Sequence, residues 1–118
     1  MKNDWEQMRD EVVAFRDARD WKQFHTPKNL AAGLAIEAAE LQEQFLWCTD
    51  EECEARIRDR GRRKAIAEEL ADVVNYALLL ANHMGLDLPT EIRRKIRINA
   101  RKYPVSKSKG VAKKYTEL

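Results

Sequence analysis

Apolar and polar residues follow each other along most of this chain with the period of an α-helix. Apolar side chains recur three, four and seven residues apart in segments 4–19, 27–47, 62–84 and 90–103, which is the spacing that places them on one face of a helix. No segment shows the two-residue alternation of a half-buried strand. The pattern predicts an all-α protein.

Capping residues predict several helix ends. Thr26 is placed to cap a helix that has Pro27 in its first turn, and Thr49 with Glu52 forms a capping box for a short helical turn to about residue 59. Gly61 predicts a loose connection before the helix of residues 62–84, and Gly85 is well placed to end that helix.

The first helix has one apolar and one charged face. Its apolar stripe consists of Trp5, Met8, Val12 and Phe15. We expect the charged face to be solvated; its residues are Arg9, Asp10, Arg16, Asp17 and Arg19.

Two later helices carry acids where apolar residues are expected. Glu37 lies on the apolar stripe of segment 27–47 with Glu40 beside it, and Glu69 and Asp72 share a face with Val73. No Lys or Arg occurs in residues 29–55 or 65–92. Burying an unpaired carboxylate costs several kcal/mol, so a shared metal cation between the two helices is the simplest explanation.

Hard oxygen ligands favour Mg²⁺ or Mn²⁺ over zinc, and Mg²⁺ is commonly shared with substrate phosphates. A di-iron helical bundle is a weaker interpretation, because such bundles use Glu-x-x-His pairs and neither acidic pair here contains histidine. The plainest alternative is that the four acids are ordinary solvated or ion-paired helix residues.

Composition narrows the class of protein. A chain of 118 residues with a net charge of +2 is expected to form one domain, and nucleic-acid binding is not expected from that charge. The two cysteines match neither a zinc pattern nor a disulfide framework. No apolar run is long enough to cross a membrane, and the N-terminus lacks the apolar core of a signal peptide, so we expect a cytoplasmic protein without membrane contact.

The helix of residues 62–84 is apolar around most of its circumference. A few helices of this length cannot bury that surface within one subunit, which predicts a homo-oligomer.

Aromatic and basic residues are candidates for nucleotide contacts. Trp21, Phe24, His25, Trp47 and Tyr76 could stack on a base or read its polar edge, although Trp and Phe are more often core residues. Lys95, Asn99 and Lys102 lie four and seven residues apart on one face of the last helix and could bind phosphates; Asn99 could equally make a core hydrogen bond.

Several motifs together resemble the all-α nucleoside triphosphate pyrophosphohydrolases of the MazG-like superfamily. They are Glu37-Ala-Ala-Glu40, Glu69-Leu-Ala-Asp72 and the run from Lys95 to Tyr103-Pro104. The chain looks closest to the dCTP pyrophosphatase branch, through residues 19–25, Phe45-Leu46-Trp47, Leu86 to Pro89 and Lys114 to Leu118.

The resemblance implies a MazG-like helical bundle completed by homo-oligomerisation, as a homotetramer or at least a homodimer. It implies Mg²⁺-dependent hydrolysis of a nucleoside triphosphate, most specifically dCTP or modified dCTP, to the monophosphate and pyrophosphate. By position, Glu37, Glu40, Glu69 and Asp72 would be catalytic metal ligands, and one of them or Glu43 could take a proton from water. The implied substrate-binding residues are Trp21, Lys22, Gln23, Phe24, His25, Trp47, Tyr76, Lys95, Asn99 and Lys102.

We therefore expect a pyrophosphohydrolase domain in residues 1–103 and a basic, flexible tail in residues 104–118. The enzyme would clear the nucleotide pool. Two alternatives remain: a MazG-like pyrophosphatase of broader specificity, and a catalytically idle helical adaptor whose basic last helix and tail bind nucleic acid or an acidic partner.

Overall fold

The computed structural model describes residues 1–118 and contains helices but no strands, which confirms the all-α prediction. The α-helices are α1 (Asp4–Ala18), α2 (Pro27–Glu43), α3 (Asp50–Arg58), α4 (Arg60–Met84), α5 (Leu88–Lys102) and α6 (Val105–Ser108). Two short 3₁₀ turns, η1 (Lys22–Phe24) and η2 (Tyr115–Glu117), complete the chain. The chain forms two units, Met1–Gly85 and Leu86–Leu118.

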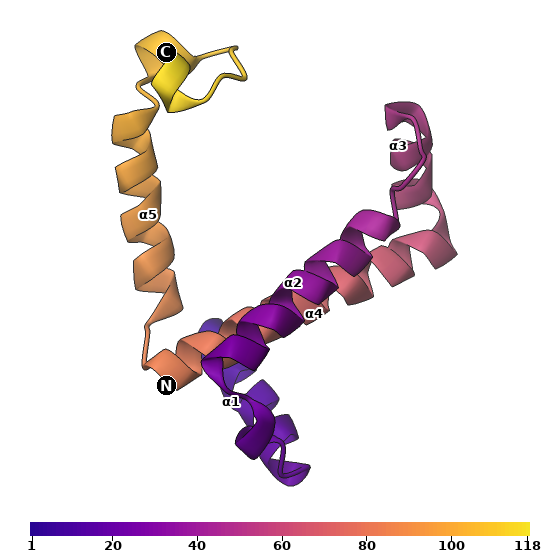
Figure 1. Ribbon diagram of the computed structural model, residues 1–118, viewed down its shortest axis with the longest axis vertical. Coiled ribbons are helices and arrows are strands. Elements are labelled where there is room, and N and C mark those ends of the chain that lie inside the picture. The colour runs from indigo at the N-terminus through magenta and orange to yellow at the C-terminus, as the bar shows by residue number, and fades with distance from the viewer. The chain divides into compact units, whose positions relative to one another are not determined.

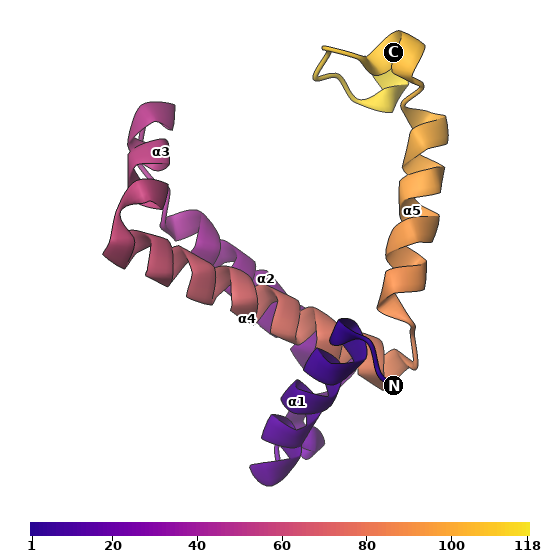
Figure 2. The same ribbon diagram turned by 180° about the vertical axis from the view of Figure 1, so that it is seen from behind.

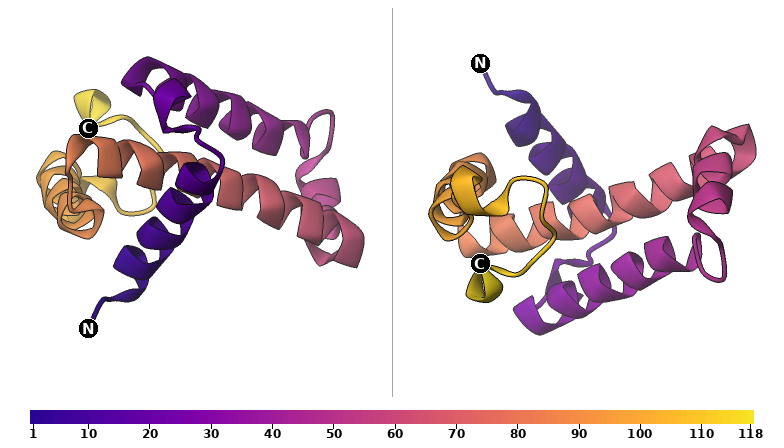
Figure 3. Two further views of the ribbon diagram at one scale, coloured as in Figure 1. Left: turned by 90° about the horizontal axis from the view of Figure 1, so that it is seen from below. Right: turned by 90° about the horizontal axis from the view of Figure 1, so that it is seen from above.

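A hairpin of α2 and α4 forms the centre of the first unit (Figures 1 and 2). The short helix α3 joins the two at one end, and α1 packs across α4 (Figure 3). The buried apolar residues are Leu30 on α2 and Leu78, Leu79 and Ala81 on α4. The core of this unit therefore lies where α2 and α4 meet.

The caps predicted at Thr26, Thr49 and Gly85 are confirmed, but the full capping box expected at Thr49 is not formed, because the Glu52 carboxylate accepts from the Thr49 hydroxyl and not from its backbone N–H. The side chain of Thr26 accepts a hydrogen bond from the backbone N–H of Asn29, with Pro27 in the first turn, and Thr49 caps α3 by accepting from the N–H of Glu52. Gly85 ends α4 in the left-handed conformation, at φ 67°. These local signals set where the hairpin begins and ends.

Two expected helix ends were wrong. Helix α2 ends at Glu43, because Gln44 and Phe45 bond to carbonyls three residues back instead of four. Gly61 is not a loose connection but part of α4, because the side chain of Asp59 caps this helix by accepting from the N–H of Arg62.

The second unit contains α5, α6 and η2. Within it, the rings of Tyr103 and Tyr115 meet edge to face at 6.0 Å, and the Lys102 ammonium lies 4.9 Å from the centre of the Tyr115 ring. These contacts hold η2 near the end of α5. The proposed division between residues 103 and 104 stays a prediction.

Both cysteines are free thiols. None of the helices combines the length and the apolar character that crossing a membrane requires.

Candidate active site

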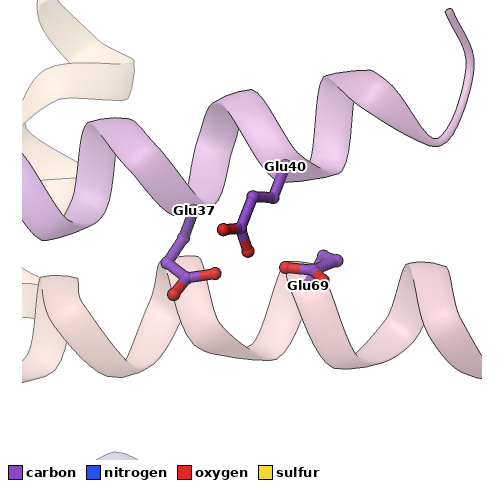
Figure 4. A group of neighbouring side chains, drawn as sticks. All are labelled: Glu37, Glu40 and Glu69. Carbon is purple, nitrogen blue, oxygen red and sulfur yellow. The ribbon is translucent and has the colours of Figure 1, made fainter.

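Three carboxylates meet between α2 and α4. Glu37 and Glu40 extend from α2 toward α4, where Glu69 lies opposite them (Figure 4). One oxygen from each of the three residues lies within 4.8 Å of the others. The three-residue spacing places Glu37 and Glu40 one turn apart on α2, and the packing of α4 supplies the third group.

Two oxygens in this cluster are buried without a hydrogen-bond partner. They are Oε2 of Glu37 and Oε2 of Glu69. No lysine or arginine forms an ion pair with any of the three glutamates. Buried polar atoms are normally satisfied, so these orphaned oxygens fit a site that receives a cation.

Burial and mutual repulsion raise the pKa values in the cluster. Burial raises the pKa of Glu37 to about 7, and Glu40 and Asp72 add to the rise. Burial also raises the pKa of Glu69, with Glu40 contributing. Like charges held this close disfavour ionisation, whereas a bound divalent cation would favour it.

Asp72 lies beside the three glutamates without being part of the tight group. Its charge acts on both Glu37 and Glu69, and it is placed one turn after Glu69 on α4. The expected set of four acids is therefore found as a tight group of three with a near neighbour. Their role as metal ligands stays a prediction.

A cavity of about 870 Å³ adjoins the acidic cluster within the first unit. It lies between α1, the connection that holds Trp21 and His25, and the helices α2 and α4, and Glu37 and Asp72 form part of its wall. Three predicted nucleotide-binding residues line it, namely Trp21, His25 and Tyr76. A volume of this size is within the range of small-ligand sites.

One wall of the cavity is aromatic. The rings of Phe15 and Trp21 meet edge to face at 5.8 Å, and the Arg19 guanidinium lies 3.6 Å from the centre of the Phe15 ring. On another side, the Tyr76 ring packs against Gly33 so closely that a Cβ at this glycine would lie 2.4 Å from it. Gly33 thus sets the place of Tyr76 beside the cavity.

The remaining candidates lie elsewhere. Lys22, Gln23 and Phe24 form η1, between the lining residues Trp21 and His25, but they do not line the cavity themselves. Trp47 follows the end of α2 and is 93% exposed. Lys95, Asn99 and Lys102 lie on α5 in the second unit and are exposed. Their contact with a substrate stays a prediction.

Arg16 lies in the wall of the cavity and not on the solvated face of α1. Its predicted position on a solvated face was wrong: the residue is 6% exposed and lines the cavity. Arg16 follows Met8 and Val12 at intervals of four residues, and both of these line the cavity as well. That spacing was the signal that could have identified it.

Comparison with known protein families identifies the family of this chain. The model of the MazG-like family matches residues 33–118, which include α2 from Gly33 onward, all of α4 and all four acids. The chain belongs to the MazG-like family. The resemblance found in the sequence is thereby confirmed.

Similar proteins include dCTP pyrophosphatase 1 of Bos taurus, which is 43% identical over 104 residues, and that of Homo sapiens, which is 42% identical over the same length. Each alignment covers 88% of this chain, and 62% and 61% of the two relatives. The chain thus spans less than two thirds of these relatives. A crystal structure of a pyrophosphatase from Archaeoglobus fulgidus aligns with a TM-score of 0.78 and 40% identity, covering 88% of this chain and 95% of that one.

Proposed function

We propose that this protein is a Mg²⁺-dependent nucleoside triphosphate pyrophosphohydrolase that acts on dCTP or cytosine-modified dCTP. Water attacks the triphosphate, and the products are dCMP and pyrophosphate. Such an enzyme would remove unwanted nucleotides from the pool. The identity of 42–43% with mammalian proteins called dCTP pyrophosphatase 1 supports the substrate.

The observation that carries the proposal is the carboxylate cluster at the edge of the cavity. Glu37, Glu40 and Glu69 offer oxygens within 4.8 Å of one another, two of them buried and unpaired. With Asp72 beside them, these residues would hold Mg²⁺, or Mn²⁺ in its place. When bound, the cation supplies charge that neutralises the triphosphate and lowers the pKa of a water molecule.

The chain's own residues then position the reactants. Glu37, Glu40, Glu69 and Asp72 would hold the cation, and one carboxylate of the cluster or Glu43 would accept a proton from the attacking water. Trp21 and Tyr76, on the cavity wall, would hold the base in place. Lys95, Asn99 and Lys102, on one face of α5, would bind phosphate oxygens.

Self-association is part of this proposal, with a homotetramer favoured and a homodimer possible. Ile36 is 58% exposed, and Leu70 and Trp47 are also exposed. These residues belong to or follow the two helices that form the acidic cluster. A second copy that covers them would bury apolar surface next to the site.

A panel of nucleoside triphosphates, each assayed with and without Mg²⁺, tests the function. We expect pyrophosphate release that depends on Mg²⁺ and is fastest with dCTP or a modified dCTP. Similar rates with several bases would support a broader pyrophosphatase. Release of single phosphate, or binding of DNA or RNA with no hydrolysis, would contradict the proposal.

A further inference from the structure

The buried guanidinium of Arg16 is only partly satisfied by the protein. Its Nε and Nη2 atoms lie 2.9 and 2.8 Å from the same oxygen, Oδ1 of Asp17. Its Nη1 atom has no hydrogen bond. A guanidinium carries five N–H donors in a planar fork, so a residue that is 94% buried keeps free donors at the wall of the cavity.

His25 offers the opposite kind of group in the same cavity. Its Nδ1 atom is buried and has no hydrogen-bond partner. Burial lowers the pKa of His25, and the positive charge of Arg16 lowers it further, so the imidazole is neutral at pH 7. A neutral imidazole accepts a hydrogen bond at one ring nitrogen. The wall of the cavity thus combines unpaired donors of Arg16 with an unpaired acceptor, Nδ1 of His25, which is itself closed off from solvent.

Cytosine has the complementary pattern on its polar edge. Its O2 and N3 atoms are adjacent acceptors, and its 4-amino group is a donor. Uracil and thymine carry an N3–H donor in place of the N3 acceptor and a carbonyl in place of the amino group. An arginine fork that faces O2 and N3 would therefore accept cytosine and meet a donor with either of the other pyrimidines.

We propose that Arg16 determines base specificity by donating hydrogen bonds to O2 and N3 of a cytosine ring, while the ring of His25 turns toward the cavity to accept one from the 4-amino group. This inference rests on the proposed nucleotide substrate and adds the residue that selects the base. The Phe15–Trp21 pair lines the same cavity as Arg16 and supplies aromatic surface for the faces of the ring. The 5-position of cytosine takes no part in this pattern, so a 5-substituted cytosine would be read in the same way.

The test compares Arg16→Gln and Arg16→Lys with a matched control, Arg9→Gln. Arg9 lies two turns earlier on α1 and makes the same local pairing, with Nε and Nη2 at 3.1 and 3.0 Å from Oδ1 of Asp10. It does not line the cavity. Arg16→Lys keeps a positive charge and an alkyl stem but lacks the planar fork of donors, so it can be used for the test even if Arg16→Gln does not fold.

The measured quantity is the ratio of kcat/KM for dCTP to that for dUTP. We expect this ratio to fall roughly 10-fold or more in both Arg16 variants, because a bidentate contact discriminates between bases at about that level. Arg9→Gln should leave it unchanged. An unchanged ratio, whether kcat/KM falls equally for dCTP and dUTP or does not fall at all, would overturn the assignment of Arg16.

Quenching of tryptophan fluorescence by dCMP and dUMP in EDTA separates this inference from the function. Wild-type protein should bind dCMP more tightly than dUMP, and Arg16→Lys should remove the difference. If the wild type shows this preference but hydrolyses no triphosphate, the proposed function fails while the base-reading role stands. If it hydrolyses triphosphates without preferring cytosine, the role of Arg16 fails alone.

Discussion

The carboxyl group of Glu37 links the stability of the metal-free protein to pH. Its pKa is raised from 4.5 to about 7 in the folded protein. Between these values the folded protein holds a proton that the unfolded chain releases, so the free energy of unfolding falls as pH rises. In EDTA, titration of Glu37 should therefore lower the melting temperature as the pH rises from about 4.5 to 7. Above pH 7 this effect should level off.

Glu37→Gln is the matched variant, because it removes the titrating group and keeps its size. It should flatten this part of the pH profile and raise the melting temperature at pH 8 relative to the wild type. Mg²⁺ should stabilise the wild type more at pH 8 than at pH 5, since a protonated carboxyl binds cations poorly. An identical pH profile in both proteins would show that Glu37 does not titrate in this range.

Individual site residues differ in how far the sequence predicted them. Glu37 and Glu69 could be placed on facing helices because each interrupts an apolar stripe. Arg16 was predicted on the solvated face, because most charged residues on a surface helix are solvated, and its burial depends on how α1 packs across α4. The four-residue spacing from Met8 and Val12 places Arg16 at the edge of the apolar stripe, but only the packing of the helices decides whether that edge is covered.

Helices α2 and α4 come into close contact at Gly33. A methyl group there would lie 2.4 Å from Cε1 of Tyr76, so Gly33→Ala must displace the ring or separate the helices. We expect a loss of about 1–3 kcal/mol in the free energy of unfolding, measured by urea denaturation. Binding of dCMP should weaken as well, because Tyr76 lines the cavity.

Gly61→Ala is the control within the same hairpin. A Cβ at Gly61 meets nothing closer than 3.7 Å, and the residue lies within α4. This substitution should stabilise the protein by about 0.5–1 kcal/mol, the usual gain from replacing a helical glycine by alanine. If both substitutions had the same effect, the close approach at Gly33 would not be important for stability.

Helix ends were predictable where a single side chain marks them. Thr26 and Thr49 accept hydrogen bonds from backbone N–H groups three residues later, and Gly85 adopts a positive φ. Each of these helix ends can therefore be predicted from a few neighbouring residues. The end of α2 at Glu43 gave no such signal, because Phe45, Leu46 and Trp47 continue the apolar pattern. Trp47 instead adopts a positive φ of 61°. A bulky residue rarely takes this conformation, so a tryptophan in the sequence does not predict it.

Exposed apolar side chains on the hairpin predict that the chain is not a monomer. Ile36→Lys would place a charge in any interface that covers this face of α2, which costs several kcal/mol if the charge is desolvated. We expect the wild type to sediment as a tetramer or dimer and Ile36→Lys to sediment as a smaller species. Ser106→Lys, an exposed position outside the hairpin, should leave the assembly unchanged; monomeric wild type would contradict the prediction.

The family, the helical class and the acidic hairpin could all be predicted from the sequence, because they depend on periodicity and on motifs within single helices. The cavity could not, since it is formed by side chains from α1, α2 and α4 together. A contribution of α5 to the site stays a prediction. It rests on the spacing of Lys95, Asn99 and Lys102 and on the resemblance of that run to the family.

We propose that the carboxylates between α2 and α4 bind the divalent cation that hydrolysis requires. Mg²⁺-dependent release of pyrophosphate from dCTP, measured for wild type, Glu69→Gln and Glu68→Gln, tests it most directly. Glu68 is the exposed neighbour of Glu69 on α4 and is outside the cluster, so its variant should match the wild type. Glu69→Gln should lower the rate at least about 100-fold, which is more than the loss of an outer-shell partner usually costs. A Glu69→Gln enzyme with the wild-type rate and Mg²⁺ dependence would contradict the role of these carboxylates as metal ligands.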